Sequence, residues 1–183
     1  MNVDQCSALA RVLGGMTHSP LGNYIIPGLT SSLVGGSDRG TVRVFECSRD
    51  HEENVVPHSH RFDFGCFVVR GCVRNRLWRR ATPGYGDTYR TSTLTYSGAP
   101  GEYQVKPGDY AAWQAEETSY GPGDVYTMTA DQVHSIWFTR GALVVFFEGP
   151  TKTDKSIVLE PVVDGVPIPT FRTEPWMFSR GTK

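Results

Sequence analysis

Short runs of alternating apolar and polar residues follow one another along the chain after Gly40. A period of two is typical of strands that bury one face, and turn residues such as Pro83-Gly84, Pro107-Gly108 and Pro122-Gly123 separate the runs. The pattern predicts strands at 41–47, 55–60, 64–69, 72–78, 88–96, 102–106, 110–113, 125–129, 134–138 and 142–147. We therefore predict an all-β fold, a barrel or a sandwich.

The two ends of the chain follow a different pattern. Residues 3–13 place apolar side chains at roughly helical spacing, which predicts a short N-terminal helix. The sequence from there to residue 40 is rich in Gly, Ser and Pro, which predicts an extended arm with strand-like segments at 23–26 and 31–34. Near the C-terminus, Asp164-Gly165 accepts the positive φ angles of a tight hairpin turn.

An apolar cluster closes the sequence: Phe171, Trp176, Met177 and Phe178 lie in an otherwise polar tail. Such a cluster is expected to dock on its own barrel or on a second subunit, so a homodimer is one expected assembly. We predict three parts: an N-terminal helix and arm (1–40), a β-barrel (41–150), and a C-terminal hairpin and docking tail (151–183).

Composition limits the classes of partner. The 183 residues, 39% of them hydrophobic and 20% charged, fit one globular domain. A formal net charge of -1 gives no general attraction to nucleic acid or to an anionic membrane, which favours a small-molecule partner. The four cysteines show neither a zinc spacing nor the density of a secreted disulfide scaffold, and no segment is apolar enough to span a membrane. We expect a soluble protein of the reducing cytoplasm.

The candidate chemistry begins at His58-Ser59-His60. Two histidines separated by one residue project from the same face of a strand, so both imidazoles can hold one ion. A third histidine, His134, lies on a predicted strand far downstream and would complete a set of three nitrogens that leaves coordination positions open. We predict a divalent metal site formed by His58, His60 and His134; the alternative is a chance match, because His-x-His is common.

The two histidine segments resemble the two motifs of the cupin superfamily of small β-barrels. The first cupin motif contains His-x-His, a Glu after a short gap, and a Gly six residues later; the second runs Gly, five residues, Pro-x-Gly-x-x-His. Residues 58–71 look like the first motif and residues 123–134 look like the second. The resemblance covers about residues 41–150 and implies a single cupin, jelly-roll-like barrel. Phe64 stands where a typical cupin has its metal-binding Glu.

Cupins that lack this Glu and use three histidines include the thiol dioxygenases, and residues 58–78 are similar to the matching stretch of cysteine dioxygenase. The resemblance implies non-haem Fe(II), O₂ and a small thiol substrate. The chain departs from that family at Phe64, Val145 and Phe147, which stand where a crosslinking cysteine, a histidine and a tyrosine are expected. A fainter similarity, in residues 57–64 and 174–178, is to uncharacterised cupin-like proteins of tailed bacteriophages.

Three hypotheses for function remain open at this point. The first is a metal-dependent cupin, specifically a non-haem Fe(II) dioxygenase acting on a small thiol or a related molecule. The second uses Zn, Mn or Ni as a Lewis acid in an isomerase, lyase or hydrolase, and requires Asp63 or Tyr126 as general acid or base. The third is a non-catalytic module that binds a small ligand.

Asp63 and Cys66 lie close to the His-x-His segment in sequence. For Asp63 we consider a fourth metal ligand, an acceptor that orients an imidazole, and a salt-bridge partner of Arg61. Cys66 shares strand parity with Phe64 and is expected to point into the barrel as a small apolar side chain.

Overall fold

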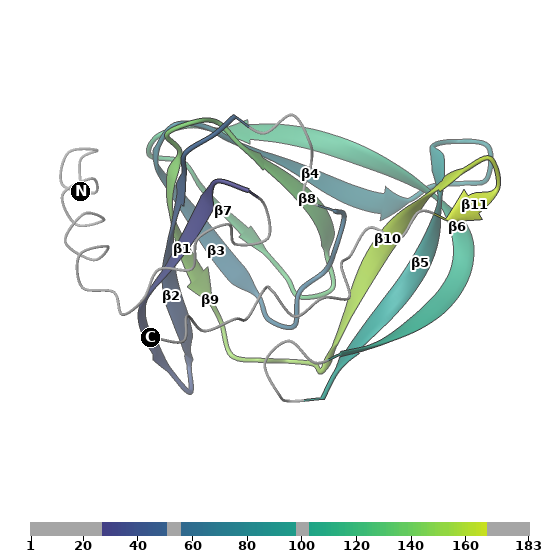
Figure 1. Ribbon diagram of the computed structural model, residues 1–183, viewed down its shortest axis with the longest axis horizontal. Coiled ribbons are helices and arrows are strands. Elements are labelled where there is room, and N and C mark those ends of the chain that lie inside the picture. Colours follow the sequence, from purple (N-terminus) through teal and green to yellow (C-terminus); the bar gives the residue numbers. More distant parts are fainter. Residues whose placement is uncertain (1–26, 51–55, 98–102, 168–183) are drawn as a thin grey trace.

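The computed structural model describes residues 27–50, 56–97 and 103–167 (Figure 1). All of the regular elements in these residues are strands, which confirms the all-β prediction. They are β1 (Leu29–Ser37), β2 (Gly40–Cys47), β3 (Phe64–Arg70), β4 (Val73–Arg80), β5 (Asp87–Tyr96), β6 (Tyr103–Tyr120), β7 (Val125–Met128), β8 (Val133–Phe138), β9 (Leu143–Glu148), β10 (Lys155–Val163) and β11 (Val166–Pro167). The predicted N-terminal helix and the apolar tail lie outside the described residues. Within the described ranges there is no helix of the length and apolarity that a membrane span needs.

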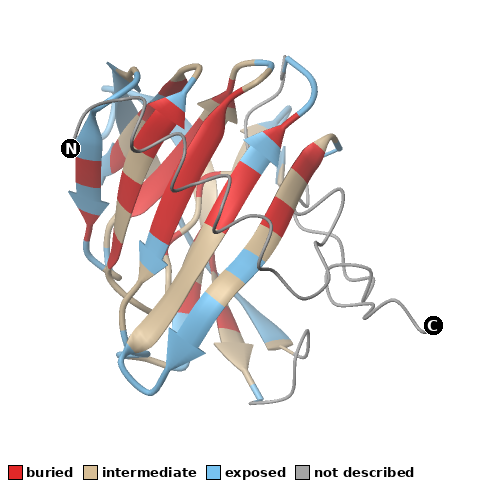
Figure 2. Ribbon diagram, turned by 90° about the vertical axis from the view of Figure 1, so that its left-hand side faces the viewer, coloured by how far each residue is buried: buried red, intermediate tan, exposed pale blue. Residues whose placement is uncertain are grey.

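The strands form two antiparallel sheets. The first has five strands in the order β1-β2-β9-β3-β7, and the second has six in the order β11-β10-β5-β6-β4-β8. Buried positions recur along the strands, with exposed and half-buried positions between them (Figure 2). The largest apolar cluster joins the two sheets: Phe45, Phe64, Val68 and Phe146 come from the first, and Val73, Ile136 and Phe138 from the second.

Strand β6 differs from the prediction. We predicted two short strands, 102–106 and 110–113, separated by a turn at Pro107-Gly108, and this was wrong because β6 is one strand of 18 residues. Pro107 pairs with Ser92 and Tyr110 with Arg90, so two residues of β6 lie opposite the single Thr91. This arrangement is a β-bulge, which absorbs the extra residue without ending the strand. A Cβ at Gly108 would meet the Thr91 carbonyl oxygen, so the bulge requires glycine there.

The sheets extend on both sides of the predicted barrel limits of 41 and 150. Strand β1 pairs with β2 along its length, and β10 pairs with β5 from Lys155 to Pro161. At the end of β10 the chain turns at Asp164 (φ 51°) and Gly165 (φ 79°), the positive values expected for this dipeptide in a tight hairpin. The three-part division of the chain stays a prediction.

The His-x-His segment joins the two sides of the six-stranded sheet. The predicted strand at 55–60 is reduced to an isolated bridge at His58, which pairs with both His134 of β8 and Val158 of β10. The His58 and His134 amides donate to each other's carbonyl oxygens at 2.8 and 2.9 Å. On the opposite side, Ser59 N–H donates to Ile157 O at 2.8 Å. The segment therefore lies between β8 and β10 and is held by the backbone on both sides.

Candidate metal centre

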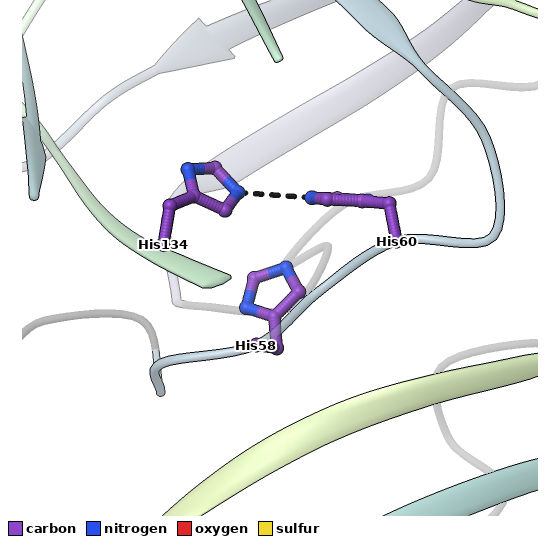
Figure 3. Close-up of side chains that lie close together, drawn as sticks. All are labelled: His58, His60 and His134. Carbon is purple, nitrogen blue, oxygen red and sulfur yellow. Dashed lines mark hydrogen bonds between the residues drawn. The ribbon is translucent and has the colours of Figure 1, made fainter. Parts of the chain in front are cut away.

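The structure brings the three predicted histidines together (Figure 3). His58 and His134 are bridge partners, which places their rings on one face, and His60 follows two residues later. Nε2 of His60 lies 2.9 Å from Nε2 of His134, and the three ligand nitrogens all lie within 4.8 Å of one another. Ring centroids are separated by 4.7 Å for His58 and His60 and by 5.1 Å for His58 and His134.

Two of these imidazoles are oriented by hydrogen bonds at Nδ1. His58 Nδ1 lies 2.7 Å from the carbonyl oxygen of Val56, and His134 Nδ1 lies 2.6 Å from Oδ1 of Asn75. A carbonyl oxygen can only accept, so in both rings Nδ1 carries the hydrogen and Nε2 keeps its lone pair for a metal. We did not single out Asn75 from the sequence. The available signal was that it is an amide between Val73 and Leu77, on the apolar side of its strand.

Aromatic rings surround the imidazoles. The Phe64 ring centroid lies 4.7 Å from that of His60 and 5.4 Å from that of His134, and Phe62 and Phe146 also lie against His60. Burial lowers the pKa of His58, and it lowers the pKa values of His60 and His134 well below their usual range, with the neighbouring imidazoles adding to the effect. The three rings are therefore neutral at neutral pH, the form that binds metal ions.

The donor set fits a divalent transition metal. With metal–nitrogen bonds of about 2.1 Å, two nitrogens at right angles around one ion lie about 3.0 Å apart. The His60–His134 nitrogen separation of 2.9 Å matches this value. Across the part of the chain that the structure describes, the metal-ligating group contains the three histidines and no carboxylate. The buried Phe64 ring lies beside the imidazoles, so an apolar side chain covers this side of the group.

Asp63 lies outside this group. Its Oδ1 accepts a hydrogen bond from the Ala130 amide at 2.9 Å, and its Oδ2 pairs with Lys152 Nζ. The hydrogen bond from Lys152, and next that from Ala130, hold the pKa of Asp63 below its usual range. Its described contacts are therefore with Lys152 and Ala130, and not with an imidazole or with Arg61, whose guanidinium lies over the Tyr96 ring. A catalytic role for Asp63 stays a prediction.

Tyr126 is buried next to Phe64 and stacks on Tyr120, with ring centroids 4.5 Å apart. It is the strand partner of Cys66, which points into the core as expected. Burial raises the pKa of Tyr126 well above its usual range and raises that of the Cys66 thiol to about 12. Both groups therefore keep their protons at neutral pH, and Tyr126 can act as a hydrogen-bond donor but not as a base.

Two hollows flank the site. A cavity of about 170 Å³ is lined by Asn75, Tyr126, Met128 and neighbouring residues of β4, β6 and β7. A wider, open hollow of about 580 Å³ is also lined by Met128 and has Asp63, Phe64 and Phe147 in its wall. None of the three histidines lines either hollow, but Asn75 in the wall of the first and Phe64 in the wall of the second each contact an imidazole.

No family model and no curated protein matches the chain. Among solved structures, KdgF from Halomonas sp. is similar at a TM-score of 0.42 and 14% identity, over 72% of this chain and 88% of that one. A second structure, from Shewanella frigidimarina, is similar at a TM-score of 0.43 and 14% identity, over 77% of this chain and 90% of that one. It is an RmlC-like cupin. A third, Streptomyces albus HEPD with 2-hydroxyethylphosphonate and Fe(II) bound, has a TM-score of 0.41 and 10% identity, over 68% of this chain and 22% of that one.

Proposed function

We propose that the protein binds a divalent metal ion through Nε2 of His58, His60 and His134 and acts on a small molecule at that ion. The observation that carries this proposal is the convergence of three neutral imidazoles from two distant segments, two of them held by hydrogen bonds that leave Nε2 free. Three protein nitrogens leave coordination positions open for other ligands, as in catalytic sites and unlike closed structural sites.

Within this class we propose a non-haem Fe(II) dioxygenase, with a small thiol or a related molecule as substrate. Bound Fe(II) would supply adjacent positions for a substrate heteroatom and O₂, together with electron transfer. The chain itself orients His58 through the Val56 carbonyl and His134 through Asn75, and it places the apolar Phe64 ring against His60. The thiol substrate follows from the resemblance of residues 58–78 to the matching stretch of cysteine dioxygenase.

The geometry favours this chemistry over a Lewis-acid isomerase, lyase or hydrolase. Those reactions need a general acid or base beside the metal. Neither candidate contacts an imidazole in the described residues, because the Asp63 carboxylate is engaged by Lys152 and Ala130 and the Tyr126 ring lies against Phe64 and Tyr120. A dioxygenase would not require a general acid or base from the protein at this position, because a bound redox metal and O₂ would supply the reactive groups. A purely ligand-binding module would be the conclusion if the protein holds no metal.

Metal content and O₂ uptake test the proposal. The full chain, purified without a histidine tag, would be analysed for bound metal and then supplied with Fe(II) and a panel of small thiols in an oxygen-electrode assay. We expect one metal ion per chain and thiol-dependent O₂ consumption, both lost in His134→Ala. Bound zinc with no O₂ uptake after iron loading would rule out the dioxygenase, and a protein that takes up no divalent metal would rule out the metal site itself.

A further inference from the structure

We infer that Asn75 is a positioning residue for the metal centre: it fixes the tautomer and the ring orientation of His134 so that Nε2 faces the ion. This inference rests on the proposed metal-binding function. It assigns the role to a side chain that bonds to one of the three imidazoles without belonging to the metal-ligating group, and it is carried by the contacts on either side of the Asn75 amide.

The amide has one orientation that satisfies both of its neighbours. Asn75 Nδ2 donates toward Sδ of Met128 at 3.7 Å, and a thioether sulfur has no hydrogen, so it can only accept. The NH₂ group must therefore face Met128, which leaves Oδ1 directed at Nδ1 of His134, 2.6 Å away. A carbonyl-type oxygen requires a hydrogen on Nδ1, and a neutral imidazole then has its lone pair on Nε2. The hydrogen bonds therefore run in one direction, from Nδ1–H of His134 to Oδ1 of Asn75 and from Nδ2–H of Asn75 to Sδ of Met128.

Burial holds this arrangement in place. Asn75 is 7% exposed and lies in the middle of β4, where it pairs with Thr118 on one side and Ile136 on the other. His134 is 3% exposed, so its imidazole has little contact with bulk solvent. If Oδ1 were removed, either nitrogen of His134 could carry the hydrogen, and the form with Nε2–H has no lone pair on Nε2 for the ion.

The approach of His60 shows why the tautomer matters. Its Nε2 lies 2.9 Å from Nε2 of His134, so the two nitrogens compete for the same space and at most one can carry a hydrogen without repulsion. With Nδ1–H of His134 fixed by Asn75, His134 Nε2 is the acceptor of this pair and the hydrogen between them belongs to Nε2 of His60. His134 is therefore already in the form that binds an ion, whereas His60 would move its hydrogen to Nδ1 when the ion enters.

Two substitutions of Asn75 separate positioning from simple packing. Asn75→Leu keeps the side-chain size and removes the acceptor, whereas Asn75→Asp keeps an acceptor oxygen. The matched control is Ser135→Ala: Ser135 is the next residue along β8, is fully buried, and accepts a hydrogen bond from Trp78 Nε1 at 2.8 Å on the opposite face of the sheet. The Ser135→Ala substitution removes a buried hydrogen bond one residue from His134 and leaves the contacts of the imidazole unchanged.

The first readout is affinity for Co(II) or Zn(II), measured by competition with a chromophoric chelator. Loss of a group that orients a metal-ligating histidine typically weakens metal binding about 10- to 100-fold. We expect a loss in this range for Asn75→Leu, recovery of most of it in Asn75→Asp, and wild-type affinity in Ser135→Ala. Equal affinity in Asn75→Leu and wild type, or an equal loss in Ser135→Ala, would overturn the positioning role. Thermal melting of each variant establishes that it is folded.

The second readout needs no metal. Two-bond ¹H–¹⁵N spectra of the metal-free protein report which imidazole nitrogen carries the hydrogen, and we expect His134 to be the Nδ1–H form in wild type and in Ser135→Ala and a mixture in Asn75→Leu. An Nε2–H form in wild type would overturn the inference. If wild type binds neither probe metal, the proposed function fails, while this spectrum still decides whether Asn75 sets the tautomer.

Discussion

Replacing Phe64 by Ala tests whether this ring is a structural wall of the site. Phe64 is 3% exposed, and its ring packs against His60, Phe146 and Tyr126 with centroid separations of 4.7, 4.7 and 6.2 Å. The Phe64→Ala variant removes this ring and leaves a gap beside the imidazoles. Because Phe64 supplies no metal ligand, we expect a large loss of folding stability and a much smaller loss of metal affinity than in His134→Ala.

The size of the stability loss follows from the buried area. A buried Phe hides about 150 Å² or more, which at about 25 cal/mol per Å² corresponds to about 4 kcal/mol. Measured Phe→Ala substitutions in protein cores cost about 3–5 kcal/mol, a range that includes the cavity left behind. With a urea dependence of about 2–3 kcal/mol per M, the unfolding midpoint should fall by about 1–2 M.

Urea unfolding of the metal-free protein, followed by tryptophan fluorescence, measures this change. The matched control is Phe147→Ala, because Phe147 is 48% exposed on the adjacent strand and pairs with Gly65. We expect the control to move the midpoint by a small fraction of the Phe64→Ala shift. A shift in Phe64→Ala no larger than in Phe147→Ala would refute the packing described here. Loss of metal as complete as in His134→Ala would refute the view that Phe64 is not needed to hold the ion.

Three further results are expected. Burial acts to raise the pKa of Glu160, but hydrogen bonds from Arg90 Nε (2.7 Å) and Ser92 Oγ (2.6 Å) outweigh burial and lower the pKa. The ionised Glu160 carboxylate therefore stabilises the fold fully above the usual pKa range of Glu, and this stabilisation is lost as the pH falls through the lowered pKa. Urea midpoints between about pH 7 and pH 3 should therefore fall more steeply in wild type than in Glu160→Gln, and parallel curves would contradict this. Asp63→Asn should leave the bound metal unchanged by elemental analysis, since Asp63 contacts Lys152 and Ala130; loss of the metal would make Asp63 a ligand. Gly40→Ala should cost about 2 kcal/mol or more, because Gly40 has φ +136° and an added Cβ would meet the Glu148 carbonyl; an unchanged midpoint would refute this.

The sequence predicted the strands whose period-two pattern is regular, and it predicted the three histidines because their spacing carries the geometry. It did not predict the continuity of β6, since Pro107-Gly108 has the composition of a turn and becomes a bulge only when the single Thr91 lies opposite. Strand β10 was missed along most of its length because it is buried on both faces in its centre, where Val158, Leu159 and Glu160 follow one another. Such a run lacks the alternation of buried and exposed residues from which a strand is predicted.

The supporting contacts of the site were less predictable than its ligands. Asn75 lies 59 residues from His134 in the sequence, and their contact depends on the register between β4 and β8, in which Leu77 is the direct partner of His134. Register is set by long-range pairing and turn geometry, which a local pattern does not contain. For the same reason the sequence did not predict the ion pair of Asp63 with Lys152, which lies 89 residues away, beyond β9.

The segment that carries His58 also has a consequence for solubility. Strand edges with free amides and carbonyls pair readily with other chains and promote aggregation. Residues 57–59 cover edge groups of β8 and β10 at once, so the peptide that carries His58, one of the proposed metal ligands, also shields two strands from intermolecular pairing. A substitution confined to an imidazole would leave this shield intact. A change to the backbone, such as Ser59→Pro, would remove the amide that bonds to Ile157 and open an edge. Substitutions of the imidazoles would then affect metal binding, and substitutions that alter the backbone of the same peptide would promote aggregation.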